Sequence, residues 1–198
     1  MSKFEKALHA IDEAHAQDPN LVTVTDSNGV EQQVPYELHY ANKMTKYLAQ
    51  CDPDASEALR LAVRAQHLRR WEVPRSSYPQ TKAGYFAWRT VLKNRQAEQA
   101  EKICLECGYS AEEAGRVAAL VRKENLKKDR ETQTLEDVAC LVFLDDQFEE
   151  FEKAHDEEKI IGILKKTWGK MSDKGHELAL KIDMSDRAKA LVSKALAG

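Results

Sequence analysis

DASEALRLAVRAQHLRRW, residues 54–71, carries apolar side chains at helical spacing and ends in three bulky residues that include two arginines. Asp54 is a candidate N-cap, and His67 ends the apolar face. The stretch therefore predicts an amphipathic helix. The whole chain has the same character, since its 198 residues include only 8 Gly and 5 Pro. The sequence predicts an all-α protein.

Eight further segments show helical periodicity or a helix start signal, such as Pro35 in a first turn or Ser110 as an N-cap. Residues 20–34 differ, because β-branched residues flank Asn28-Gly29, which favours a small hairpin or an ordered loop. We expect a bundle of about nine helices that forms a single domain, residues 1–198. The eight helical segments are residues 3–17, 35–50, 85–107, 110–125, 132–153, 156–168, 172–181 and 185–197.

Membrane and secreted classes are disfavoured by the distribution of apolar residues. No apolar run approaches the roughly 18 residues that cross a bilayer. The N-terminus, MSKFEKALHAIDEAH, mixes acids with bases and reads as a helix rather than a signal peptide. We expect a cytoplasmic protein without a membrane partner, in which the four cysteines are thiols. The Cys104-x-x-Cys107 spacing suits metal or redox sites, but without a second pair or a close His it favours thiols of the core or surface.

Residues 60–95 form a basic patch with nine Lys or Arg and one acid, Glu72, in a chain whose net charge is -3. Arginine offers forked donors that match phosphate or carboxylate, and an indole offers a flat face for a base. The patch predicts a phosphorylated small molecule or a nucleic acid as partner. A solvated surface that pairs with acidic segments elsewhere is the alternative. The candidate phosphate-binding residues are Arg64, Arg69, Arg70, Arg75 and Trp71.

Two histidines and two acids lie on four of the predicted helices. They are His39, His67, Glu124 and Asp145. Imidazole and carboxylate ligands together suit a divalent metal such as Mn, Fe, Zn or Mg, which could activate a water beside the basic patch. In the alternative interpretation the histidines are hydrogen-bonded residues of the core or surface, and Asp145 is solvated.

The order of these residues resembles the H…HD…D pattern of the HD-domain superfamily of metal-dependent phosphohydrolases. The resemblance covers residues 35–151, where His39 matches the first His and Asp145 the final Asp. At the central doublet the chain departs from the pattern and has Gln66-His67.

This resemblance implies an HD-like core at about residues 35–151 with the helices of 156–197 packed on it. It also implies a metal-dependent phosphohydrolase that acts on a nucleotide or another phosphoester. His39, His67 and Asp145 would then be the metal ligands. Glu124 and its neighbour Lys123 are the candidate catalytic residues. The alternative is a non-catalytic protein that binds a nucleotide or RNA through the basic patch.

Three segments, AQHLRRWEVPRSSYP, ALVRKENLK and LEDVACLVFLDDQFEEF, are similar to a family of bacterial and fungal proteins. Some members are labelled glutamyl-tRNA synthetase, and the resemblance implies no established activity. Residues 170–174, KMSDK, resemble the K-M-S-K-S loop of class I synthetases. No H-I-G-H segment precedes them, and an all-α chain of this length leaves no room for a Rossmann domain. We therefore reject aminoacylation and expect Ser172 to be a helix N-cap.

Overall fold

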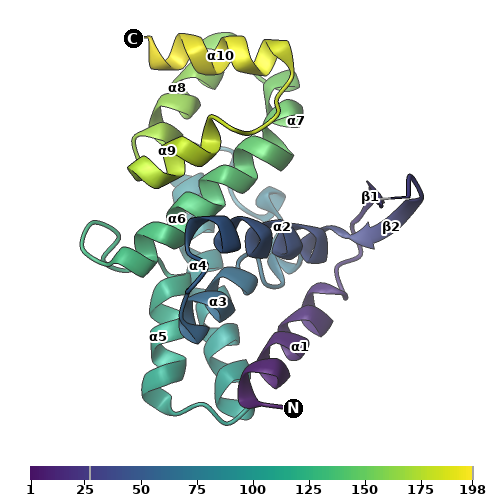
Figure 1. Ribbon diagram of the computed structural model, residues 1–198, viewed down its shortest axis with the longest axis vertical. Helices are drawn as coiled ribbons and strands as arrows, with labels where there is room; N and C mark the ends of the chain where they lie inside the picture. The colour runs from purple at the N-terminus through teal and green to yellow at the C-terminus, as the bar shows by residue number, and fades with distance from the viewer. Residues whose placement is uncertain (27, 198) are drawn as a thin grey trace. The chain divides into compact units, whose positions relative to one another are not determined.

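The computed structural model describes residues 1–26 and 28–197, which contain ten α-helices and one two-stranded sheet (Figure 1). The expected all-α class is confirmed, and the HD-like arrangement stays a prediction. The chain forms two compact units, and its expected organisation as one domain stays a prediction. Unit 1 comprises Met1–Thr45 and Ala55–Glu124, and unit 2 comprises Lys46–Asp54 and Asn125–Gly198.

Unit 1 is built from five helices, a hairpin and two short 3-10 turns. Helix α4 packs against α5 and α1, while α3 packs against α1 and α5. Ile11, Leu59, Leu61 and Leu120 are fully buried, so the core lies between these helices. The elements are α1 (Lys3–His15), β1 (Leu21–Thr25), β2 (Glu31–Pro35), the first part of α2 (Tyr36–Cys51), α3 (Glu57–Arg64), η1 (Arg70–Glu72), η2 (Arg75–Ser77), α4 (Lys82–Glu106) and α5 (Ala111–Val121).

The predicted hairpin is confirmed. Strands β1 and β2 pair antiparallel, with Leu21 opposite Pro35 and Thr25 opposite Glu31. Gly29 has a φ of +80° in the connecting turn, a conformation that glycine adopts without steric cost.

The predicted helix at residues 54–71 is wrong at both ends. Ser56 rather than Asp54 is the N-cap, and its hydroxyl accepts the Leu59 N–H at 3.1 Å. Helix α3 ends at Arg64, because the chain turns away through left-handed backbone at His67 (φ +65°). The segment that follows therefore forms turns instead of a helical face.

Unit 2 contains the C-terminal helices. Helix α6 packs against α9, and α8 packs against α10 (Figure 1). Residues 132–153 were predicted as one helix, but a π-helical turn at Phe143–Gln147 separates α6 from α7. The helices are residues 46–51 of α2, α6 (Arg130–Val142), α7 (Phe148–Lys153), α8 (Glu157–Trp168), α9 (Asp173–Ala179) and α10 (Asp186–Leu196).

Asp137 joins α6 to the start of α9. Its buried carboxylate accepts hydrogen bonds from the main-chain N–H of Ser172 at 2.8 Å and from the Ser172 hydroxyl. The same hydroxyl accepts the Gly175 N–H at 3.2 Å, so the predicted N-cap at Ser172 is confirmed. The KMSDK segment thus has a structural role.

The expected thiols are present, since all four cysteines are free. Burial raises the pKa of the Cys104 thiol to about 12, which keeps it protonated at neutral pH. Within the described ranges, no helix is long and apolar enough to cross a membrane.

Candidate functional site

A buried carboxylate in unit 1 fixes the segment that follows α3. Glu37, in the first turn of α2, is 2% exposed. Its Oε2 accepts the main-chain N–H of Arg69 at 2.9 Å, and its Oε1 accepts that of Trp71 at 3.1 Å. Hydrogen bonds from main-chain N–H groups compensate a buried carboxylate. Glu37 therefore sets the path of the backbone from Arg69 to Trp71.

His15 extends this network to α1. Its Nε2 lies 2.8 Å from the main-chain oxygen of Arg64, and its Nδ1 lies 3.3 Å from Oε2 of Glu37. Because a carbonyl oxygen can only accept, Nε2 carries a proton. Asp18 accepts the Glu37 N–H at 3.0 Å and so holds the start of α2. The hydrogen bonds of His15 and Glu37 thereby link α1, the start of α2 and the end of α3.

His67 lies beside this network with an unusual hydrogen-bond pattern. Its ring stacks on Tyr40 of α2, with centroids 3.9 Å apart, and its Nε2 lies 3.4 Å from Nη1 of Arg70. A guanidinium only donates, so Nε2 accepts and the proton of the neutral ring is on Nδ1. Nδ1 is buried and has no hydrogen-bond partner among the described residues. His67 thus presents an unpaired N–H donor.

Positive charge surrounds this imidazole. Burial lowers the pKa of His67 well below its ordinary value, and the charges of Arg70, Arg89, Lys123 and His15 lower it further. We name His67, Arg70, Arg89 and Lys123 the Arg70 cluster. The ring is neutral at pH 7, so it adds a donor to the cluster without adding repulsion.

Arg70 is the central cation of the cluster. Its guanidinium lies over the Trp88 ring, 4.5 Å from the centroid, and it is only partly exposed. Burial lowers its pKa, and the neighbouring charge of Arg89 lowers it further. Within residues 1–26 and 28–197, no carboxylate pairs with Arg70. A buried cation without a counterion is costly, so the position favours an anion.

The other three candidate arginines donate hydrogen bonds to carboxylates or main-chain oxygens of the protein itself. Arg64 donates from Nε to Asp12 at 2.6 Å, and Arg69 donates from Nη1 to Glu72 at 2.8 Å. Arg75 donates to three main-chain carbonyls of the loop that precedes α4, at 3.0, 2.9 and 3.4 Å. Trp71 is anchored through its main chain, while its buried Nε1 has no partner among the described residues.

The candidate metal ligands and the candidate catalytic residue Glu124 are distributed over both units. His39, His67 and Glu124 belong to unit 1, and the Glu124 side chain is 50% exposed and lies 3.6 Å from Arg122. Asp145 belongs to unit 2, where Tyr47 hydrogen-bonds to it. Among the described residues, no group of three or more His, Cys, Asp or Glu side chains could hold a metal ion. The metal site stays a prediction.

Backbone strain gathers at the same place. Among the described residues, four with a Cβ have a positive φ: His67 (+65°), Arg69 (+50°), Lys123 (+56°) and Asn125 (+56°). The left-handed conformation costs a residue with a Cβ about 1–2 kcal/mol. Strained backbone persists where surrounding contacts enforce it, and it clusters at functional sites. Two of these four residues, His67 and Lys123, belong to the Arg70 cluster, which supports its assignment as the candidate site.

Comparison with protein families gives one result. A domain of unknown function, DUF4202, matches residues 5–192. The chain belongs to the DUF4202 family. No curated protein and no solved structure matches it. The DUF4202 match covers all residues of the Arg70 cluster and extends through both units.

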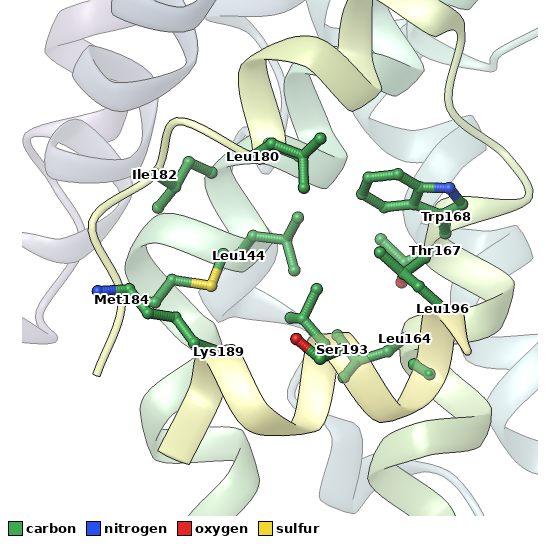
Figure 2. A pocket seen from close by; sticks show the side chains of 13 residues that line it. Leu144, Leu164, Thr167, Trp168, Leu180, Ile182, Met184, Lys189, Ser193 and Leu196 are labelled. Atoms are coloured by element: carbon green, nitrogen blue, oxygen red, sulfur yellow. The ribbon is translucent and has the colours of Figure 1, made fainter. Parts of the chain in front are cut away.

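Unit 2 of this DUF4202 protein contains a cavity of a different kind. It has a volume of about 200 Å³ and lies between α8, α9 and α10 (Figure 2). Apolar groups dominate its wall, and the side chains of Leu144, Leu180 and Trp168 point into it. The polar lining residues are Thr167, Lys189 and Ser193.

Sequence reasoning missed several residues that build the site of the DUF4202 chain. Glu37 and His15 were unremarked members of predicted helices, and Tyr40 was not considered as the partner of His67. A signal for His15 existed, because it continues the apolar positions Leu8 and Ile11 at helical spacing. A polar residue on a buried helical face needs a partner. Arg89 was counted in the basic patch but not selected.

Proposed function

We propose that the protein binds a phosphorylated ligand through the Arg70 cluster. The proposal rests on two neighbouring groups, a cation without a counterion and a hydrogen-bond donor without an acceptor. Arg70 is a partly buried guanidinium with no carboxylate among the described residues, and the adjacent His67 has an unpaired N–H. A phosphate group supplies negative charge and several acceptor oxygens.

The neighbouring arginines support this choice by contrast. Arg64 and Arg69 already hold carboxylates, and Arg75 holds main-chain oxygens. Arg70 and Arg89 have no acid partner in the described part of the chain. We therefore place the phosphate at the Arg70 cluster rather than across all four arginines of the basic patch.

Metal-dependent hydrolysis of a phosphoester is the second candidate. The aromatic surroundings common to His39 and His67 favour this candidate. His39 lies on α2, the helix whose Tyr40 stacks on His67, and Tyr36 approaches the rings of both His39 and Tyr40 at 6.5 Å. Turnover would need a divalent ion held with the help of these imidazoles, and a cytoplasmic location belongs to the same proposal.

A binding experiment with a matched control tests the first proposal. Arg70→Gln should weaken binding of inorganic phosphate or a mononucleotide at least about tenfold, since a charge-assisted hydrogen bond contributes about 1.5–3 kcal/mol. Arg60 is the control, because its guanidinium also lies 4.5 Å from a ring centroid, that of Phe4. Arg60→Gln should leave the affinity unchanged. Equal loss in both variants, or no binding by the unaltered protein, would refute the proposal.

The same samples separate a binding protein from a hydrolase. A panel of phosphoesters is incubated with Mn²⁺ and, separately, with a chelator. Turnover that requires the metal and stops in His67→Asn would support the hydrolase. Binding that persists in chelator, without turnover of any ester, would leave the binding function alone.

A further inference from the structure

The outward face of the first half of α4 carries a straight stripe of cations and one aromatic ring. Lys82, Phe86, Arg89 and Lys93 follow one another at spacings of four, three and four residues. Such positions lie above one another on an α-helix. All four are exposed. The eleven helical rises between Lys82 and Lys93 extend over about 16 Å, which is long enough to contact a few nucleotides.

The stripe is flanked by a second exposed ring that leads to the Arg70 cluster. Phe86 is 56% exposed and Tyr85 is 43% exposed, and their ring centroids are 5.8 Å apart. The Tyr85 ring lies 6.0 Å from that of Trp88, over which Arg70 sits. Arg89 belongs to both the stripe and the cluster. The aromatic surface is thus continuous with the proposed phosphate site.

The charges on this face decide between partners. From Lys82 to Ala97 the chain has no acidic residue, and the described residues give Lys82, Arg89 and Lys93 no ion pair. An apolar protein partner would cover these cations without compensating them. Single-stranded nucleic acid offers phosphates for the cations and base faces for exposed rings.

We propose that single-stranded nucleic acid binds along this stripe, with one of its phosphates at the Arg70 cluster. Phe86 and Tyr85 stack on bases, while Lys82 and Lys93 contact flanking phosphates. The inference rests on the proposed phosphate binding and names the class of ligand. Duplexes are excluded from this mode, because their paired bases are stacked within the helix and cannot cover a protein ring.

The test measures the affinity of a fluorescent oligouridine of about 12 nucleotides and, in parallel, of uridine monophosphate. The oligonucleotide should bind at least about tenfold more tightly than the monophosphate, and its affinity should fall steeply with salt. Phe86→Ala and Lys93→Gln should each weaken oligouridine at least about threefold and leave the monophosphate unaffected. Leu105→Ala and Lys102→Gln are controls on the same helix, with the Leu105 side chain 46% exposed and Lys102 75% exposed.

The outcomes distinguish this inference from the function on which it rests. Monophosphate binding that depends on Arg70, together with oligouridine that binds no more tightly, overturns the inference and keeps the phosphate site. Equal effects of the stripe and control variants also overturn it. If neither probe binds, the phosphate site itself is refuted. A duplex of the same length should compete less well than the single strand. Equal competition by the two would reject the stacking role of Phe86.

Discussion

The centre of unit 1 and the cavity of unit 2 keep their shapes by different means. In unit 1, Glu37 accepts main-chain donors from a segment more than 30 residues away, and the stacked His67 and Tyr40 rings lie beside cations. In unit 2, hydrocarbon groups such as those of Leu144 and Leu164 form the wall. Hydrogen bonds have direction, so the first region fixes individual donor positions, whereas apolar packing fixes volume. The first suits recognition of charge and the second suits recognition of shape.

The largest expected effect breaks the carboxylate on which unit 1 depends. Glu37→Ala should lower the free energy of unfolding by about 3–5 kcal/mol, because it leaves His15 and two main-chain N–H groups without their acceptor. Chemical denaturation followed by circular dichroism measures this change. Glu13→Ala, at a side chain that is 66% exposed, is the control and should cost little. A loss below about 1 kcal/mol at Glu37 would contradict its central role.

A somewhat smaller effect is expected at the apolar wall of unit 2. Leu164 is 5% exposed, and Leu164→Ala should cost about 2–4 kcal/mol through lost burial and added cavity volume. Leu180 lines the same cavity but is 67% exposed, so Leu180→Ala should cost much less. Similar denaturation midpoints for the two variants would show that the wall does not pack as described.

The smallest of the three effects is a pH dependence of the free energy of unfolding that arises from His67 in unit 1. His67 has a folded pKa below its unfolded value of about 6.5, so the unfolded chain binds the extra proton. Stability should therefore fall as the pH drops below about 6.5, by at most about 1.4 kcal/mol per pH unit until the folded pKa is reached. Above about pH 6.5 the imidazole of His67 is neutral in both the folded and the unfolded chain, so its contribution to stability is constant.

Denaturation at two pH values, one above and one below 6.5, tests this expectation. His67→Asn removes the group while its side chain tolerates left-handed backbone, so the variant should lose less stability on acidification than the unaltered protein. His9→Asn, at a side chain that is 62% exposed, should keep the original pH dependence. An unchanged slope in His67→Asn would show that the imidazole protonates freely in the folded state.

The sequence predicted the locally determined parts of the fold. Ser110 caps α5 through a capping box with Glu113, and Gly29 occupies the hairpin turn, because both depend on residues a few positions away. The end of α3 was missed for the opposite reason. Its backbone continues toward Arg69, whose N–H bonds to Glu37 across 32 positions of sequence. Helical periodicity contains no information about such a partner.

The candidate site was predictable in composition but not in detail. The concentration of arginine was evident, and Arg70 and His67 were among the selected residues. Arg69 and Arg70 are neighbours of the same type, yet one pairs with Glu72 and the other lies over Trp88. Which arginine stays available depends on the direction of each side chain. The backbone at Arg69 is left-handed, a conformation that the sequence does not reveal.

The left-handed backbone at His67 and Lys123 also bears on how this site can be altered. Glycine adopts such backbone without steric cost, so glycine at either position would relieve conformational strain. The chain instead carries an imidazole and an ammonium group there, and it gives up some stability to do so. Glycine substitutions that stabilise the protein at these two positions would thus remove the imidazole and the ammonium group from the proposed site. Engineering for heat resistance should leave this pair untouched and begin with the apolar wall of unit 2.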